Sequence, residues 1–147
     1  MAQDRFFGQR CGCSEEHVFQ DHAVGVKDIV EAGGRAGVGS HGQLQGLGYR
    51  WELWSMQSGG LSEHDALRTA TIFGAESIGL GAELGSIESG KLADLVVLER
   101  NPLDDIRNTN AIRFVMKNGR LYDAETLDEK WPRRQKLERA DWVETEP

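Results

Sequence analysis

The pattern of apolar and polar positions predicts a first helix that begins at Ser14. This serine is a favourable N-cap, and two acidic residues follow it in the first turn. Apolar residues then recur at spacings of three and four, the period of an amphipathic helix, at Val18, Phe19, Ala23, Val26, Ile29 and Val30. The glycine pair Gly33–Gly34 ends the pattern, so we expect the helix to end there.

A strand and two further helices are predicted after the glycine pair. Residues 35–40, RAGVGS, are too short for a helix and are apolar at Ala36 and Val38, which favours a buried strand of a parallel sheet. A glycine-rich loop leads into a helix containing YRWELWSMQS. The last helix is predicted within LSEHDALRTATIFGAESIGL, where Ser62 and Asp65 form a variant of the capping box. This order of elements is typical of an α/β unit.

The period changes to strands and turns after Gly81. The glycine-bounded GSIESGK predicts a hairpin-like segment, and Leu95–Leu98 is the most strand-like run in the chain. Asn118–Gly119 lies between two apolar runs and strongly indicates a hairpin turn. We therefore expect four parts: a frayed N-terminus over 1–13, helices and one strand over 14–80, a β region over 81–123, and a charged, partly ordered arm over 124–147.

The composition argues against several classes of function. The chain has 147 residues, of which 39% are hydrophobic and 28% charged, and its formal net charge is −7. An acidic chain without a basic face is poorly suited to neutralising nucleic-acid phosphates. No apolar run approaches the roughly 20 residues that cross a bilayer, and no stretch near the N-terminus is apolar enough for a secretory signal. We expect a cytoplasmic protein that binds neither nucleic acid nor membrane.

Cys11 and Cys13 are separated by a single residue. A disulfide between them would close a strained loop, and the sequence has no second cysteine pair to complete a zinc site. We interpret them as free thiols, with weak metal binding as the alternative.

Four sequence blocks in the second half of the chain carry a family resemblance. They are ALRTAT at Ala66–Thr71, GSIESGKLADLVVL at Gly85–Leu98, NPL at Asn101–Leu103 and VMKNG at Val115–Gly119. With these blocks, residues 32–122 resemble the C-terminal portion of the metal-dependent amidohydrolase superfamily, near its imidazolonepropionase-like and prolidase-like members. The GKLADLVVL block is the most specific of the four.

The resemblance implies a composite fold of which this chain supplies a part. Family members pair a (β/α)₈ barrel, which carries the chemistry, with a smaller β-sandwich built from both chain ends. A barrel takes roughly 250 residues, and about 200 at the least, so this chain cannot contain one. The implied fold class is α/β: the last strand-helix units of the barrel over 14–80 and the C-terminal half of the sandwich over 81–123. Oligomerisation would complete the barrel.

The resemblance also implies where a site would lie. In the family, the last barrel strand ends in an aspartate that binds metal and accepts a proton from the attacking water. This chain has His41 at that position, so we expect His41 to be a catalytic residue or metal ligand once the missing strands are present. The alternative is a loop histidine bonded to the backbone. Gln43 and Arg50 are candidates for substrate binding, and Glu52 either orients His41 or is an ordinary helix-face charge.

Two functions follow as hypotheses. The first is the C-terminal part of a metal-dependent amidohydrolase, which hydrolyses a C–N bond in a cyclic amide, a small amide or a dipeptide-like substrate. The complete enzyme would use a divalent metal, with zinc expected. The chain lacks the family's H-x-H pair, bridging lysine and later barrel histidines, so we expect neither a catalytic metal nor turnover from the isolated chain. The second is a stand-alone interaction or oligomerisation module. Unpaired strand edges predict a homo-oligomer.

Overall fold

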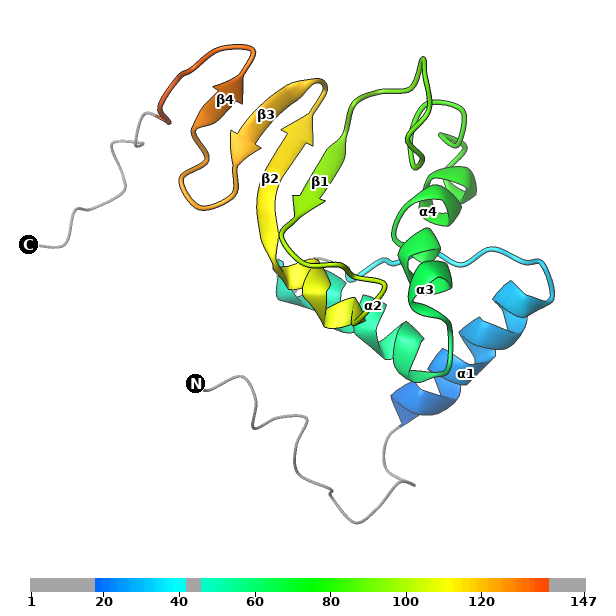
Figure 1. Ribbon diagram of the computed structural model, residues 1–147. Coiled ribbons are helices and arrows are strands. Elements are labelled where there is room, and N and C mark those ends of the chain that lie inside the picture. Colours follow the sequence, from blue (N-terminus) through cyan, green and yellow to red (C-terminus); the bar gives the residue numbers. More distant parts are fainter. Residues whose placement is uncertain (1–17, 42–45, 138–147) are drawn as a thin grey trace, which may run out of the picture.

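The computed structural model describes residues 18–41 and 46–137, which form a helical part and an antiparallel sheet (Figure 1). The helices are α1 (Val18–Glu31), α2 (Leu47–Ser58), α3 (Glu63–Thr69) and α4 (Ile72–Ser77). The strands are β1 (Leu95–Leu98), β2 (Ile112–Lys117), β3 (Arg120–Asp123) and β4 (Glu129–Trp131), with the 3₁₀ helix η2 (Ile106–Asn110) between β1 and β2. None of the helices in these ranges is long and apolar enough to cross a membrane.

Helices α1 and α2 approach closely where α2 ends. A Cβ on Gly59, the C-cap of α2, would lie 2.3 Å from the carbonyl carbon of Ala23, and Ala23 is itself buried. The backbone of Gly59 has a φ of −76°, which any residue can adopt. The close approach of the two backbones, rather than conformational freedom, therefore requires glycine at this position.

The predicted cap of α3 is confirmed, because Ser62 Oγ accepts a hydrogen bond from the Asp65 N–H at 3.1 Å. The prediction of one continuous helix beyond it is wrong. The chain leaves helical geometry at Thr71, with φ −132° and ψ −102°, and restarts as α4. Around this break, the hydroxyls of Thr69 and Thr71 donate to backbone carbonyls three and four residues earlier, each at 2.7 Å. Such local bonds compete with a regular helix.

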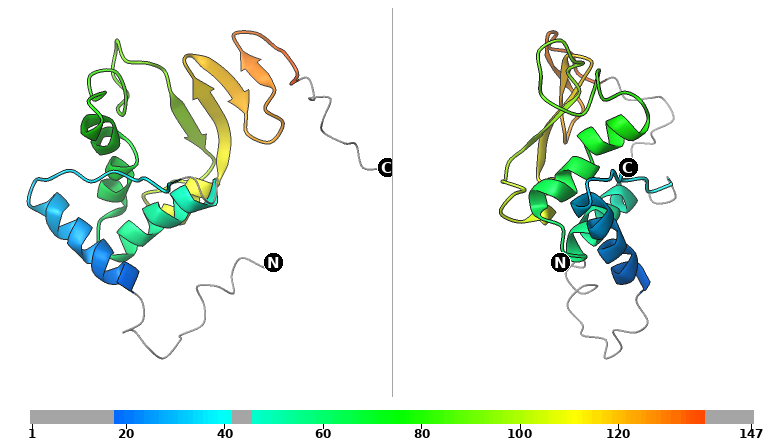
Figure 2. Two further views of the ribbon diagram at one scale, coloured as in Figure 1. Left: turned by 180° about the vertical axis from the view of Figure 1, so that it is seen from behind. Right: turned by 90° about the vertical axis from the view of Figure 1, so that its right-hand side faces the viewer.

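The hydrophobic core lies between α2, α3 and η2. It consists of the buried Leu53, Met56, Leu61, Ala66 and Ile106, with Val26, Val30, Val38, Trp54, Leu67 and Ala70 packed against them. Ile106 is contributed by η2, whose N-terminus is capped by the Asp105 carboxylate. The Trp54 Nε1–H also donates to Thr109 Oγ1 at 3.1 Å. Through these contacts η2 attaches the sheet to α2, and Figure 2 shows the sheet meeting the helices at this end.

The parallel strand predicted over 35–40 is not formed. This segment is free of regular secondary structure and runs behind α3 toward the start of α2 in Figure 1. A strand needs a neighbouring strand for its backbone hydrogen bonds. The described residues place none beside this segment, and the four strands that they do form are all antiparallel. Residues 35–40 therefore take their contacts from helices.

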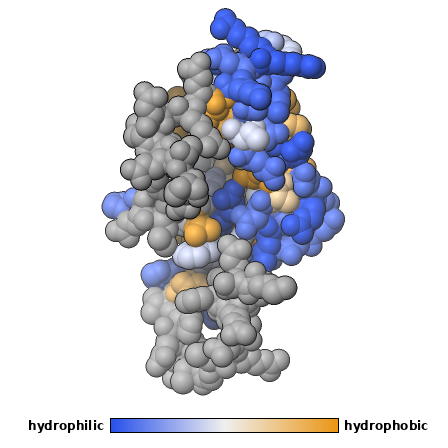
Figure 3. Space-filling view, turned by 90° about the vertical axis from the view of Figure 1, so that its left-hand side faces the viewer, coloured by the Kyte–Doolittle hydropathy of each residue, from blue (hydrophilic) through white to orange (hydrophobic). Residues whose placement is uncertain are grey.

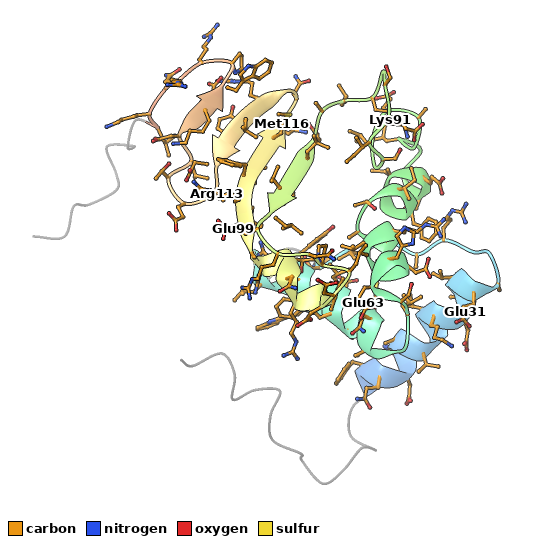
Figure 4. The ribbon with its side chains drawn as sticks, in the orientation of Figure 1. Glu31, Glu63, Lys91, Glu99, Arg113 and Met116 are labelled. Atoms are coloured by element: carbon orange, nitrogen blue, oxygen red, sulfur yellow. The ribbon has the colours of Figure 1, made fainter. Side chains whose placement is uncertain are left out.

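The hairpin-like segment predicted at GSIESGK consists of turns instead of paired strands. Lys91, labelled in Figure 4, organises these turns. Its Nζ donates to the Gly81 carbonyl at 2.6 Å and to Ser86 Oγ at 2.5 Å, and lies 3.2 Å from the Glu88 carboxylate. The Lys91 side chain is 11% exposed. The largely buried ammonium group of Lys91 thus joins the turns to one another. In a hairpin, hydrogen bonds between the two backbones would do this.

The sheet has the strand order β1-β2-β3-β4. The hairpin predicted at Asn118–Gly119 is confirmed: these residues have φ values of 48° and 76°, and Lys117 pairs with Arg120 across the turn. Two positive φ angles are what a type I′ turn requires. The Asp94 carboxylate, just before β1, accepts the Asn118 N–H at 2.6 Å and pairs with Lys117. The hairpin is thereby attached to the chain that enters β1.

The sheet extends past residue 123 into the segment predicted to be a charged arm, because β4 pairs with β3. Asp123 and Glu129 hold this end of the sheet, and each of these residues is 5% exposed. Asp123 Oδ1 accepts the N–H groups of Thr126 and Glu125 at 3.1 Å each, and Glu129 pairs with Arg120. The hydrogen bond from Thr126 is the largest of the causes that lower the pKa of Asp123, and the opposing effect of desolvation does not reverse it.

The close contact at Gly59 predicts that Gly59→Ala destabilises the protein. The added methyl group must push α1 away from α2, which we expect to lower the free energy of unfolding by about 1–3 kcal/mol. Gly25→Ala in α1 is the matched control, because a Cβ there would meet no atom within 4 Å. The control should raise stability by about 0.5–1 kcal/mol through helix propensity. Urea unfolding followed by circular dichroism measures both, and equal stability of the two variants would contradict the prediction.

The lowered pKa of Asp123 predicts a loss of stability in acid. A carboxyl group whose pKa is lower in the folded state stabilises the fold above its unfolded pKa. That stabilisation disappears as the pH falls through the folded pKa. We expect Asp123→Asn to be less stable than the parent at pH 7 and to lose less stability between pH 5 and pH 3. Urea midpoints across this range test the prediction, with Asp28→Asn on α1 as the charge-matched control. A parallel pH profile for Asp123→Asn and the parent would refute it.

Candidate functional site

The candidate site is the turn at the end of segment 34–41, which carries His41. The segment is anchored at its start by Arg35, whose guanidinium pairs with Glu76 of α4 and donates to the Gly33 carbonyl at 3.1 Å. The same guanidinium lies over the buried ring of Phe73, 4.6 Å from its centroid. This ion pair and cation–π contact hold the start of the segment against α4.

The middle of the segment packs directly on α3 and α4. A Cβ on Gly37 would lie 3.3 Å from the Cα of Gly74, so the two backbones pass each other closely. One residue later, the Val38 N–H donates to the Thr69 carbonyl at 3.2 Å, and the Val38 side chain packs against the hydrophobic core. Backbone contacts with two helices thus fix the course of the chain up to Val38.

The next residue is held from α2. The Gly39 N–H donates to Glu52 Oε2 at 3.0 Å. The sequence left Glu52 with two roles, as a partner of His41 or as a charge on a helix face. The structure gives it another role, as the acceptor of a backbone N–H two residues before His41. A hydrogen bond to an ionised carboxylate is stronger than one between neutral groups.

His41 itself has an exposed side chain and a φ of 54°, in the left-handed region. That conformation costs a residue with a Cβ roughly 1–2 kcal/mol. Among the described residues, no hydrogen bond or ion pair involves its ring, and both interpretations of His41 stay predictions. An exposed imidazole can ligate a metal or transfer a proton. Gln43 lies outside the described residues.

Arg50, the other candidate for substrate binding, is half-buried and donates from Nη1 to the Gly46 carbonyl at 3.0 Å. The sequence did not single out the adjacent Tyr49. Its hydroxyl donates to the Ala70 carbonyl at 3.0 Å and so joins α2 to the break between α3 and α4. Partial desolvation of the hydroxyl, and then the charge of Glu52, raise the pKa of Tyr49. No local sequence pattern marks this long-range contact.

The described residues do not fit a metal site by themselves. Within them, no group of three or more His, Cys, Asp or Glu side chains is placed to hold an ion. His22 is exposed on α1, and the imidazole of His64 lies 4.0 Å from its neighbour Asp65 on α3. His17, Cys11 and Cys13 lie outside the described residues. A catalytic metal near His41 would need ligands that this set does not supply.

The β4 end of the sheet is on the side of the molecule that faces the viewer in Figure 3. An open depression of about 550 Å³ is present there. Its lining is mostly charged and comprises Arg113, Phe114, Leu121, Asp123, Asp128, Glu129, Lys130, Arg134, Gln135 and Lys136. Figure 4 labels Arg113 on β2 beside Glu99, and their charged groups lie 3.8 Å apart. Neither His41 nor Arg50 lines this depression.

Comparisons with known proteins identify relatives. A model of the amidohydrolase family matches residues 10–122. The imidazolonepropionase of Symbiobacterium thermophilum is 56% identical over 65 residues, which are 42% of this chain and 15% of that protein. The guanine deaminase of Escherichia coli K12 is 37% identical over 76 residues, which are 50% of this chain and 17% of that protein. The chain thus spans less than a fifth of either curated relative.

Solved structures agree with the sequence match. A crystal structure of a Xaa-Pro dipeptidase with methionine bound in its active site superposes with a TM-score of 0.61 at 32% identity. The superposition covers 71% of this chain and 25% of that one. A putative prolidase from Bifidobacterium longum gives a TM-score of 0.57 at 34% identity, over 81% of this chain and 28% of that one. Because the family model matches most of its length, the chain belongs to the amidohydrolase family.

Proposed function

We propose that the chain acts as the C-terminal part of a metal-dependent amidohydrolase. It would supply the end of the last barrel strand, the helices after it and one half of the β-sandwich. The observation that carries this proposal is the family match over residues 10–122 in a chain that spans only 15–17% of the two curated relatives. The rest of such an enzyme would come from outside these residues.

The proposed reaction is hydrolysis of a C–N bond other than an ordinary peptide bond. A guanine deaminase and a Xaa-Pro dipeptidase are among the relatives. Their names indicate a deamination and the cleavage of a dipeptide. A cyclic amide, a small amide or a dipeptide-like molecule is therefore the substrate class that we propose. A cytoplasmic location stays a prediction.

We assign His41 to the position at which the family has its strand-end aspartate. Its exposed ring and the anchoring of the chain before it support this assignment. A bound divalent metal, zinc by our expectation, would supply an activated water in the complete enzyme. The ligand set for that metal lies beyond the described residues, so we derive no step through it. Gln43 and Arg50 stay candidates for substrate binding.

A chimera tests this assignment. Residues 32–122 replace the corresponding section of the Symbiobacterium thermophilum imidazolonepropionase, chosen by superposing the two structures, once with His41 and once with His41→Asp. We expect both chimeras to fold, and the aspartate version to turn over the relative's own substrate about 100-fold faster, because the carboxylate restores the family's proton acceptor. The isolated 147-residue chain is the control, with metal content measured by mass spectrometry.

Two outcomes would contradict the assignment. Folded chimeras with equal turnover would show that residue 41 does not occupy the catalytic position. Stoichiometric zinc and amide hydrolysis by the isolated chain would show that it does not need the missing strands.

The alternative function, a stand-alone interaction module, is favoured by one observation. β1 is an edge strand of the sheet, and it exposes 57% of Val96 and 43% of Val97. An exposed apolar edge is a template for pairing with another chain. A second copy of this chain would cover it in a homo-oligomer.

Size-exclusion chromatography with light scattering separates the two functions. A module gives a single stable oligomer, whereas an isolated part of an enzyme gives a poorly packed monomer or an aggregate. If β1 forms the interface, Val96→Lys should convert the oligomer to monomer by placing a charge on the edge, while Lys130→Ala on β4 should leave it intact. An oligomer that survives Val96→Lys would exclude pairing through β1.

A further inference from the structure

We propose that Glu52 is a positioning residue of the candidate site, because its carboxylate fixes the backbone of the turn that presents His41. The importance of this turn for catalysis rests on the function proposed above. The positioning itself is a property of the described structure and can be measured without activity.

The first argument is the order of the anchors along the segment. Arg35 is held by α4, and Val38 by the Thr69 carbonyl at the end of α3. Among the described residues, the bond from the Gly39 N–H to Glu52 is the last anchor before His41, with only Ser40 between them. The direction in which the chain leaves the helices therefore depends most directly on this bond.

The second argument is that, among the described residues, none packs closely around Gly39. A Cβ on Gly39 would meet no atom within 4 Å, whereas one on Gly37 would already touch Gly74. His41 also has an unfavourable left-handed backbone, which persists only where the surroundings impose it. Within the described part of the chain, the directional bond from Gly39 is therefore the restraint nearest to His41.

The third argument is that α2 offers Glu52 a fixed base. Leu53, the next residue, is 2% exposed in the core, and the Tyr49 hydroxyl bonds to the Ala70 carbonyl. Tyr49 and Glu52 lie three residues apart on α2, so they are neighbours on one face of the helix. Because α2 is held at Leu53 and at Tyr49, the Glu52 carboxylate has a fixed position and can restrain the turn. A carboxylate on a mobile helix would move together with the turn.

The experiment compares four variants of the full chain by NMR. Glu52→Ala removes the acceptor, Glu52→Asp shortens its reach by one methylene, and Glu52→Gln keeps an acceptor oxygen at the same reach. Glu31→Gln on α1 is the control, because it removes one exposed carboxylate that pairs with Lys27 of the same helix and not with the turn. The readouts are the exchange rate of the Gly39 amide and the resonances of the His41 ring.

We expect the Gly39 amide to exchange about five- to tenfold faster in Glu52→Ala and Glu52→Asp, since one hydrogen bond is lost. The His41 ring resonances should move in the same two variants. Glu52→Gln should restore both readouts nearly to the parent values, and Glu31→Gln should leave both unchanged. Amides of α2 and α3 should keep their exchange rates in all four variants, which separates a local effect from unfolding.

Two results would overturn the proposal. An unchanged Gly39 exchange rate in Glu52→Ala would show that the carboxylate does not hold the turn. The second result is that Glu52→Gln does not restore the His41 ring resonances and the amides of α2 exchange faster. It would show that Glu52 only stabilises its own helix. Either result leaves the chimera experiment untouched, and inactive chimeras would likewise leave the Gly39 measurement unaffected.

Discussion

The backbone of the segment after α1 depends on hydrogen bonds from helices, because the described residues place no strand beside it. An extended segment without a neighbouring strand takes its backbone hydrogen bonds from other groups. Here a carbonyl at the end of α3 and a carboxylate on α2 accept successive N–H groups. The positions of α2 and α3 therefore decide the course of the chain toward His41.

Helix α2 is the element through which these restraints meet. It touches α1 where Gly59 approaches Ala23, contributes Leu53 and Met56 to the core, and holds Gly39 through Glu52. The amphipathic pattern of such a helix follows from the core side alone. Tyr49 and Glu52 each lie four residues before a buried residue, Leu53 and Met56, so they share that face, and in the structure they bond to different parts of the chain.

Local features were predictable from the sequence because neighbouring residues determine them. The Ser62 cap and the Asn118–Gly119 turn each depend on a few consecutive residues, and both are confirmed. The strand expected over 35–40 failed because its apolar pattern fits a sheet that the described residues do not form. The bond between Gly39 and Glu52 joins residues 13 positions apart, and nothing in the local pattern indicates which carboxylate the amide will meet.

The family match gives these contacts a context. In relatives with a complete barrel, the position of His41 is expected to face the remaining strands. Two helices already fix the chain before it in the part described here. A preformed turn loses less conformational entropy when the rest of a site assembles around it. Under the proposed function, α2 and α3 would therefore hold the chain before His41 in place while the rest of the site assembles.

The attachment of the sheet through η2 has a mechanical consequence. Ile106 is embedded in the core and Trp54 bonds to Thr109, whereas β3 and β4 lie progressively farther from the helices in Figures 1 and 2. The sheet is therefore attached to the helices through η2, and its outer strands lie far from this attachment. A small rotation at Ile106 would be amplified toward β4, so a force applied to the outer strands would reach α2 as a torque.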